Sequence, residues 1–366
     1  MSKYLIVSGD PSGDIHSANL MREIRHLDAR AEFIGIGGEK MISEGLQSIA
    51  KMSDVAVVGF WEVAKKYTYF KNLLEECTSI LKNYKIDVFI PVDYPGFNIR
   101  LARKAKDLSI PVIYYIAPQL WAWGKNRAKQ LAKVTDKLLV VFPFEVKYFN
   151  GFGIDAHFVG HPLLDNEILS GNFKPFNERN GKVAFFPGSR MQEVKKHLRL
   201  FSEILDLNNS GGFNLNFTIA KSSNIPLEIF SEFSKFSNVE IAENSYEIIQ
   251  NSSAGIIKTG TSNLEAALCG LPIAMFYKTS FLTYQIAQRL INLPYISLIN
   301  ILSNKPVVKE FIQNDATPNN ILSHIKMILT DENYFNAIQA DFKNIKQILG
   351  EKGASAQAAK IIIESL

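Results

Sequence analysis

Residues Val183–Val194 read Val-Ala-Phe-Phe-Pro-Gly-Ser-Arg-Met-Gln-Glu-Val, an apolar run followed by a short polar turn. The run predicts a buried strand, and the residues after the turn begin a helical pattern. Backbone N–H groups at a helix N-terminus attract anions, and arginine binds phosphate through two hydrogen bonds. We therefore expect Gly188, Ser189 and Arg190 to bind a phosphate or the diphosphate of a nucleotide. The alternative is a plain helix start, because Ser189 and Gln192 have capping-box spacing.

The same order of strand, turn and helix recurs along the chain, which has 366 residues, 47% of them hydrophobic. Helical patterns separate strand-like runs at 4–8, 32–35, 88–92, 112–116, 137–142, 183–186, 216–220, 254–257 and 273–276. This alternation predicts parallel sheets covered by helices, and the length is sufficient for two cores. The predicted fold class is therefore α/β, with two Rossmann-like doubly wound domains.

The boundary between the domains is expected around Gly160-His161-Pro162, in a weakly patterned segment. We place an N-terminal domain at 1–165 and a C-terminal domain at 166–340, facing each other across a central cleft. Residues 341–366 form a C-terminal helix, whose return to the N-terminal domain stays open. Ligands of open α/β sheets bind beyond the carboxyl ends of the strands, and every motif below follows a predicted strand.

Charge and cysteine content limit the class of protein. Cys77 and Cys269 form neither a disulfide framework nor a zinc pattern, which fits a reducing cytoplasm. We expect no cleaved signal peptide, because the first residues lack its pattern, and no apolar run is long enough to span a membrane. The net charge of +4 lies wholly in residues 1–160. This excess of positive charge favours a phosphorylated substrate or an anionic membrane surface. The alternative is that the basic residues only form a solvated helix face. Nucleic acid is a less favoured partner, because the excess is small and no nucleic-acid-binding module is present.

The loop Ser8–Asp14 joins the first strand to the first helix and holds two glycines and two aspartates. Glycine lets the backbone approach a ligand closely, and we expect Asp10 to project into the cleft beside the reacting groups. The alternative is a tight turn in which Ser12 or Asp14 caps the helix.

Asp93 follows the apolar strand 88–92 and precedes Tyr94-Pro-Gly-Phe97. A carboxylate at this position can accept a proton from a sugar hydroxyl, and general-base catalysis contributes about 10²–10⁴-fold. Partial burial beside Tyr94 and Phe97 would raise the pKa of an otherwise weak base. The alternative is a turn aspartate that bonds its own backbone.

The segment Lys258–Glu265 is a second strand-to-helix turn. The glycine and hydroxyls of Gly260, Thr261 and Ser262 suit a phosphate, and the carboxylate of Glu265 suits a ribose diol. Ser262 and Glu265 also fit a capping box, and both readings can hold together. The polar residue Asn300, inside an apolar run, is a weaker candidate.

Aromatic residues concentrate in two places. Trp121 and Trp123 follow a predicted strand and suit sugar stacking or an acyl chain. Phe60 and Trp61 belong to the amphipathic, basic segment 57–74, which could enter a membrane interface or hold a lipid chain. In both places core packing is the simpler alternative.

The chain lacks the sequence signatures of metal and serine chemistry, since Asp-x-Asp, HExxH and GxSxG are all missing. His16, His161 and His197 are isolated and more consistent with structural roles. We therefore predict no metal site and no cofactor.

The motifs GDPSGD, GIGG, VDYPGFN, PQLWAWGKNR, FPFE, GHP, FPGSRxxEV, KTGTSNLEAAL and SLINIL occur in this order. Together they resemble the lipid-A-disaccharide synthase family over nearly the whole chain. The resemblance implies the two-domain GT-B glycosyltransferase architecture. It also implies the joining of UDP-2,3-diacylglucosamine to 2,3-diacylglucosamine 1-phosphate (lipid X), which forms a β(1→6) disaccharide and UDP at the cytoplasmic membrane face.

By the same resemblance, Asp93 matches the catalytic aspartate, Arg190 the diphosphate-contacting arginine and Asn300 a polar position near the nucleotide. Asp10 stands where the family commonly has Glu, and Gly96 stands where many members have a second Asp. The implied localisation is cytoplasmic, peripheral to the inner membrane. A homodimer is possible, and the resemblance does not decide the oligomeric state.

Two other functions remain as alternatives. A UDP-N-acetylglucosamine 2-epimerase would use the same donor pocket without acyl chains or an acceptor, and the aromatic basic segment argues against it. A nucleotide-sugar sensor would bind the donor without turnover.

Overall fold

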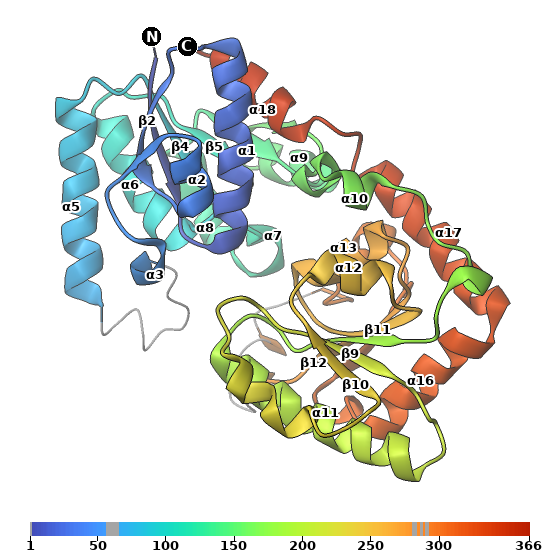
Figure 1. Cartoon of the computed structure of the whole chain (residues 1–366). Helices are drawn as coiled ribbons and strands as arrows, with labels where there is room; N and C mark the ends of the chain where they lie inside the picture. Colours follow the sequence, from blue (N-terminus) through green and yellow to red (C-terminus); the bar gives the residue numbers. More distant parts are fainter. Residues whose placement is uncertain (1, 56–65, 280–283, 286–287, 290–292) are drawn as a thin grey trace. The chain divides into compact units, whose positions relative to one another are not determined.

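The computed structural model describes residues 2–366 except 56–65, 280–283, 286–287 and 290–292 (Figure 1). The chain divides into two units. Unit 1 comprises Met1–Asp165 and Leu349–Leu366, and unit 2 comprises Asn166–Ile348. Each unit contains one parallel sheet with helices on both faces. The cleft predicted between the domains stays a prediction.

Unit 1 holds a seven-stranded sheet in the order β3-β2-β1-β4-β5-β6-β7, in which every pairing is parallel. The order of its first six strands is that of a Rossmann fold. The strands are β1 (Lys3–Ser8), β2 (Glu32–Ile36), β3 (Leu46–Ser48), β4 (Val88–Val92), β5 (Ile113–Tyr115), β6 (Lys137–Val140) and β7 (Asp155–Phe158).

Helices cover both faces of this sheet because successive strand residues point to opposite sides. Tyr4 and Ile6 of β1 face one core cluster, and Leu5 and Val7 face another. The first cluster includes apolar residues of α1 (Pro11–Leu27) and α18 (Ala354–Ile363), and the second includes those of α5 (Tyr67–Asn83) and α6 (Pro95–Asp107). The remaining helices are α2 (Glu39–Ser43), α3 (Met52–Val55), α7 (Leu120–Trp123), α8 (Lys125–Ala132), α9 (Pro143–Asn150) and the 3-10 turn η1 (Pro162–Asp165).

The C-terminal segment returns to unit 1, where α18 packs beside α1 (Figure 1). The carboxylate of Asp165 accepts hydrogen bonds from the backbone N–H groups of Gly353, Ala354 and Ser355, at 2.7, 3.1 and 3.1 Å. The returning segment begins at Leu349, not at the predicted 341. The reason is that α17 (Glu332–Ile348) is one continuous helix whose apolar face is buried in unit 2.

Unit 2 holds a six-stranded parallel sheet in the order β10-β9-β8-β11-β12-β13, again the Rossmann order. Its strands are β8 (Val183–Phe186), β9 (Phe217–Ala220), β10 (Val239–Ala242), β11 (Ala254–Lys258), β12 (Ile273–Tyr277) and β13 (Lys309–Ile312). Its helices are α10 (Glu167–Ser170), α11 (Met191–Ser210), α12 (Ser245–Gln250), α13 (Thr261–Leu268), α15 (Leu298–Ser303), α16 (Pro318–Thr330) and α17, with 3-10 turns η2 (Phe176–Glu178), η3 (Leu227–Phe233) and η4 (Gln313–Asp315).

All nine strands predicted from sequence are present, and four further strands are β3, β7, β10 and β13. These four lie at or toward the edges of their sheets. Their sequences are short or carry charge, as in Lys-Glu-Phe-Ile of β13, so they lack the apolar run that marks a central strand. Among the described residues, no helix is long and apolar enough to cross a membrane.

Candidate functional site

Asp10, Asp93 and the two glycine-containing turns of unit 2 lie at the carboxyl ends of the central strands of each sheet. In unit 1 the strand order reverses between β1 and β4, which lead into the loops of Asp10 and Asp93. In unit 2 it reverses between β8 and β11, which lead into the turns of Gly188–Arg190 and Gly260–Ser262. Open α/β sheets bind ligands at such reversal points.

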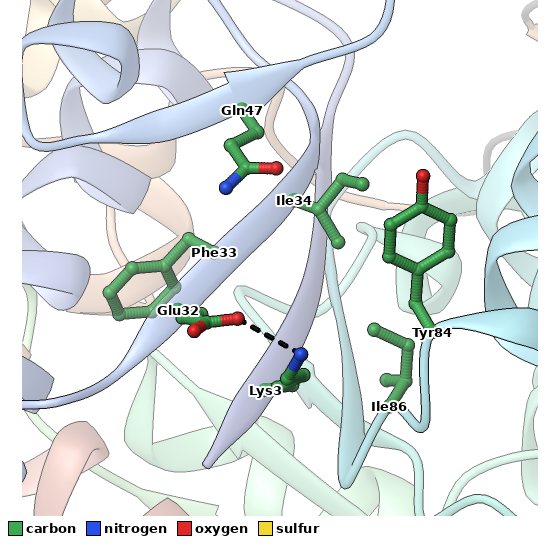
Figure 2. Close-up of a pocket in the computed structure, with 7 residues that line it drawn as sticks. All are labelled: Lys3, Glu32, Phe33, Ile34, Gln47, Tyr84 and Ile86. Carbon is green, nitrogen blue, oxygen red and sulfur yellow. Dashed lines mark ion pairs between the residues drawn. The ribbon is translucent and has the colours of Figure 1, made fainter. Parts of the chain in front are cut away.

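A small pocket opens at the opposite, amino-terminal edge of the unit 1 sheet (Figure 2). Its lining includes Lys3 and Glu32, whose side chains form an ion pair at 3.1 Å. The two charged side chains of the pocket are therefore paired with each other.

The backbone at Asp93 is strained and firmly held. Asp93 has φ +42° and Tyr94 φ +50°, and the neighbouring Ile116 has φ +59°, which is rare for a β-branched residue. The amide of Asn98 donates to the carbonyl of Asp93 at 2.9 Å, and the Tyr114 hydroxyl also donates to this carbonyl. Strained backbone of this kind persists only where its surroundings impose it, and it is enriched at functional sites.

The carboxyl group of Asp93 is only partly exposed. Burial and, to a smaller extent, the charge of Asp10 raise its pKa to about 7, against a hydrogen bond from the Tyr94 N–H that lowers it in part. A carboxyl group with a pKa near neutrality can both accept and hold a proton at physiological pH. The simple turn aspartate considered from sequence does not account for this environment.

Asp10 is exposed and caps α1, because its Oδ1 accepts a hydrogen bond from the N–H of Gly13 at 2.7 Å. The sequence alternative of a cap by Ser12 or Asp14 is therefore wrong. Asp14 is buried and instead binds backbone N–H groups at the start of α2, including that of Gly38 at 2.8 Å.

Gly9 packs directly against the ring of Tyr94, leaving no room for a β-carbon. The glycine therefore allows the loop after β1, which carries Asp10, to pack closely against the loop after β4, which carries Asp93.

Of the four aromatic candidates, the structure describes the side chain of Trp121 alone. Its indole N–H donates to Oε1 of Glu145 at 2.9 Å, and its ring contacts Phe144 edge-on. Phe60 and Trp61 lie outside the described residues, and of Trp123 only the backbone at the end of α7 is described.

Glu145 was not a candidate from sequence, although it ends the FPFE motif. It is fully buried, and burial raises the pKa of its carboxyl group to about 7, against hydrogen bonds from Trp121 and the backbone that lower it. Its other oxygen accepts from the N–H of Phe142 at 3.1 Å. An acidic residue just inside a helix N-terminus was the available sequence signal.

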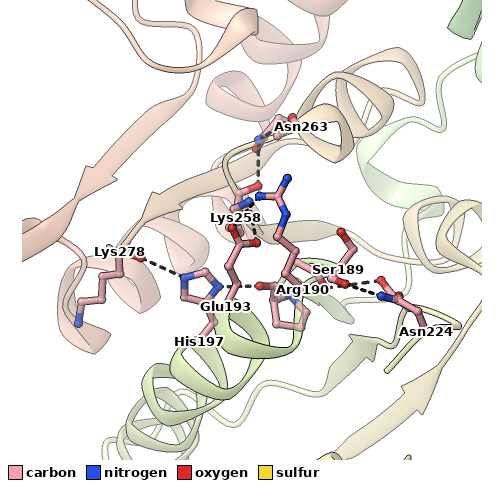
Figure 3. A network of polar contacts seen from close by, with 12 residues as sticks. Ser189, Arg190, Glu193, His197, Asn224, Lys258, Asn263 and Lys278 are labelled. Atoms are coloured by element: carbon pink, nitrogen blue, oxygen red, sulfur yellow. Dashed lines mark hydrogen bonds and ion pairs between the residues drawn. The ribbon is translucent and has the colours of Figure 1, made fainter. Parts of the chain in front are cut away.

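In unit 2 the turn after β8 has an open helix end. Gly188 has φ +110°, a conformation that favours glycine, and Arg190 is the N-cap of α11 without a side-chain capping bond. The capping box proposed for Ser189 and Gln192 is therefore wrong. His197 contacts this turn, with Nδ1 2.6 Å from the carbonyl oxygen of Pro187 (Figure 3).

Arg190 belongs to a charged cluster (Figure 3). Its Nη1 lies 3.1 Å from Oε1 of Glu193, and Nζ of Lys258 lies 3.0 Å from Oε2 of the same carboxylate. Arg190 therefore already has an anionic partner inside the protein, the carboxylate of Glu193. Arg190 nevertheless remains about half exposed, at 53% of its side-chain surface. Neither Glu193 nor Lys258 was a candidate from sequence.

The turn after β11 ends in Gly260, the N-cap of α13, so Thr261 and Ser262 are the first residues of the helix. The capping box proposed for Ser262 and Glu265 is therefore wrong, since Ser262 already lies within the helix. Glu265 receives a hydrogen bond from the Tyr246 hydroxyl at 3.5 Å, and burial raises the pKa of its carboxyl group.

Asn300 is fully buried in α15. Its amide nitrogen donates to the carbonyl of Val308 and to Glu310, each at 2.9 Å, and its oxygen accepts from the N–H of Val308 at 2.9 Å. These bonds use its polar atoms to join α15 to the segment that enters β13.

Across the described residues, no group of three or more His, Cys, Asp or Glu side chains is placed to hold a metal ion. In unit 1, His161 is buried and the neighbouring His16 is half-buried, and burial lowers the pKa of both imidazoles, that of His161 to about 3. Both are therefore neutral at physiological pH.

The chain is similar to known proteins in sequence and in fold. The model of the family described as lipid-A-disaccharide synthetase matches residues 4–363. The lipid-A-disaccharide synthase of Geobacter sulfurreducens is 34% identical over 377 residues, which cover 100% of this chain and 97% of that protein.

Two solved structures share the fold. The glycosyltransferase of kitacinnamycin has a TM-score of 0.68 at 12% identity, covering 100% of this chain and 99% of that one. The UDP-GlcNAc 2-epimerase of Neisseria meningitidis, bound to UDP-GlcNAc, has a TM-score of 0.64 at 13% identity, with the same coverage. At such low identity these similarities establish the fold alone, and they confirm the predicted GT-B architecture.

The sequence match decides between a transferase and an epimerase, because it extends over nearly the whole chain and carries a single family name. The epimerase alternative is accordingly not favoured. This chain belongs to the lipid-A-disaccharide synthase family and is a glycosyltransferase.

Proposed function

We propose that this chain transfers 2,3-diacylglucosamine from UDP-2,3-diacylglucosamine to lipid X in a single displacement with inversion, and that Asp93 is the general base. The observation that carries this proposal is the environment of Asp93. The residue stands at the strand-order reversal of unit 1, on a strained backbone, with a pKa near 7.

The proposed step balances as follows. The 6-hydroxyl of the acceptor gives its proton to the Asp93 carboxylate as its oxygen forms a bond to the anomeric carbon of the donor. The bond from that carbon to the diphosphate oxygen breaks, and its electron pair leaves with UDP. A base whose pKa lies near the working pH combines a large deprotonated fraction with useful proton affinity.

Asp10 assists Asp93 in this proposal through its charge. It raises the pKa of Asp93 and is itself fixed by the hydrogen bond to Gly13. Asp10 therefore makes Asp93 a stronger base without needing to contact the acceptor.

Unit 2 binds the nucleotide in this proposal. The diphosphate accepts hydrogen bonds from the turn Gly188-Ser189-Arg190 and from the helix start Gly260-Thr261-Ser262, and Glu265 holds the ribose. Preformed donors at helix N-termini stabilise the charge that develops on a departing diphosphate without a required metal. Asn300 acts indirectly, by holding α15 to β13.

The acyl chains are assigned to the aromatic residues of unit 1, namely Phe60, Trp61, Trp121 and Trp123. Aromatic side chains combine a large apolar surface with a polar edge, which suits a lipid at a membrane surface. With these residues the protein would work at the cytoplasmic face of the inner membrane, as a peripheral protein. Whether it does so as a homodimer stays open.

One assay tests the proposal. Purified protein is given UDP-2,3-diacylglucosamine and lipid X, and the products are separated by mass. Disaccharide 1-phosphate together with UDP is the expected result. UDP without disaccharide, or donor that is bound but unchanged, would overturn it and would favour an epimerase-like enzyme or a nucleotide-sugar sensor, respectively.

A further inference from the structure

Lys258 is placed at the carboxyl end of β11, where the strand enters the Gly260 turn. Its side chain is mostly buried, with 17% of its surface exposed, and its Nζ lies 3.0 Å from Oε2 of Glu193. The amide of Asn263 fixes the turn by donating to the carbonyls of Lys258 and Gly260, at 3.0 and 3.1 Å. The position of this ammonium group is therefore well defined (Figure 3).

The Lys258 side chain also contacts the other turn of the site. A β-carbon built on Gly188 would lie 3.6 Å from Cδ of Lys258 and 3.1 Å from a carboxylate oxygen of Glu193. Lys258 thus starts from the turn after β11 and reaches the turn after β8. It lies between the two backbone segments assigned above to the diphosphate.

The charges in this cluster do not balance. Arg190 and Lys258 share Glu193, the one carboxylate paired with either cation in the described part of the chain. Burial alone would raise the pKa of Glu193, but Lys258 and then Arg190 outweigh it, and the pKa is lowered. The carboxylate is therefore ionised, and two cations against one anion leave one positive charge for a ligand.

We propose that Lys258 is a second cation for the diphosphate of the UDP-sugar and of the departing UDP, beside Arg190. A diphosphate carries charge on two phosphoryl groups, so two cations from two adjacent turns match it better than one. Lysine binds phosphate as a point charge, whereas arginine adds a directed fork. This inference rests on the proposed function, because it presumes that unit 2 binds UDP.

A purely structural role for Lys258 would be the neutralisation of Glu193. The two roles separate when Lys258→Met is made both in the native chain and in a Glu193→Gln background. In that background no carboxylate remains to be neutralised. A diphosphate-binding lysine still matters there, and a merely neutralising lysine does not.

The measurement is the dissociation constant of UDP by titration calorimetry, with inorganic pyrophosphate and uridine as further probes. Lys258→Met should weaken UDP and pyrophosphate about 10- to 100-fold in both backgrounds, the range for a charged hydrogen bond. Uridine should bind unchanged, and Lys258→Arg should restore most of the UDP affinity. The proposal would be overturned if adding Lys258→Met to Glu193→Gln left UDP affinity unaltered. It would also be overturned if uridine affinity fell as much as UDP affinity.

Lys182→Met is the matched control, because Lys182 forms an exposed ion pair with Glu240 at the same 3.0 Å, just before β8. Lys182→Met should leave UDP affinity within about twofold. If it weakened UDP as much as Lys258→Met does, the effect of Lys258 would be explained by the net charge of the protein alone. Circular dichroism establishes that each variant is folded. Failure of the native chain to bind UDP would overturn the proposed function itself, whereas normal UDP binding by the Lys258 variants would overturn the role of Lys258 alone.

Discussion

The indole N–H of Trp121 donates a 2.9 Å hydrogen bond to the buried carboxyl group of Glu145. The bond joins the one-turn helix α7 to the start of α9, where Glu145 also accepts from the Phe142 N–H. The bond thereby connects two motifs that are separate in the sequence, PQLWAWG and FPFE, within the unit that also holds Asp10 and Asp93. The charge of Asp93 also raises the pKa of Glu145.

Glu145→Ala should therefore disturb the acceptor side without disturbing UDP binding. The change leaves the N–H groups of Trp121 and Phe142 without their acceptor, at a cost of about 1–3 kcal/mol for each buried group. We expect a lower melting temperature and a raised KM for lipid X, with an unchanged Kd for UDP. Glu76→Ala, on the exposed face of α5, is the control. Unchanged stability and lipid X kinetics would show that this bond is unimportant.

Asp93→Asn should remove the base while preserving the shape of the site. Loss of general-base catalysis corresponds to a fall in kcat of about 10²–10⁴-fold. UDP affinity, measured by calorimetry, should stay within about twofold because the nucleotide is assigned to unit 2. Asp107→Asn, an exposed change on α6, should retain full activity. Substantial turnover by the Asp93 variant would require another base.

The pH dependence of transfer should follow the ionisation of Asp93. A base acts when deprotonated, so kcat should rise as the pH increases through about 7. Asp10→Asn removes the nearby negative charge and should move this rise to lower pH, while asparagine still caps α1. Rates measured from pH 5 to 9 give both profiles. Coincident profiles for the native and Asp10 proteins would contradict the assigned coupling.

The same raised pKa makes Asp93 a cost to folding at alkaline pH. Burial favours its protonated form, so its contribution to stability is present below the unfolded pKa and is lost as the pH rises through about 7. Asp93→Asn should therefore raise the free energy of unfolding at pH 8, on the order of 1–3 kcal/mol, and by much less at pH 4. Urea denaturation at the two pH values measures the difference. A variant that is less stable at pH 8 would refute this sign.

Arg190→Ala should weaken UDP by roughly 2–5 kcal/mol, the scale for removing one partner of a desolvated charged pair. The effect should be specific to phosphate, so uridine binding serves as an internal comparison. Arg199→Ala, at an exposed position of the same helix α11, is the matched control. If UDP binds the Arg190 variant with undiminished affinity, the turn after β8 is not the diphosphate site.

The positions of several candidate site residues in the fold could be predicted from sequence, because an apolar strand followed by a Gly-containing turn and a helix identifies its own carboxyl end. Asp93, Arg190 and Gly260 were predicted in this way to follow strands, and the structure places them after β4, β8 and β11. The helix caps were harder to predict: Ser12, Ser189 and Ser262 all have suitable side chains, yet the first turns begin elsewhere. Capping depends on the residue at which the backbone leaves the strand, and spacing alone does not specify it.

Asn300 is a residue whose contacts could not be predicted from sequence. A polar residue inside an apolar run suggested a ligand contact, whereas the amide of Asn300 is bonded to Val308 and Glu310. A buried asparagine must satisfy its donors and acceptor within the protein, and only the packing of β13 against α15 reveals where they go.

The order of the amino acids alone establishes the two parallel α/β units and the turns that follow their central strands, since periodicity and turn residues are local properties. The packed fold establishes the pKa of Asp93, the carboxylate shared by Arg190 and Lys258, and the return of α18 to unit 1. These features depend on burial and on contacts between residues distant in sequence, and such distances exist only once the chain has folded.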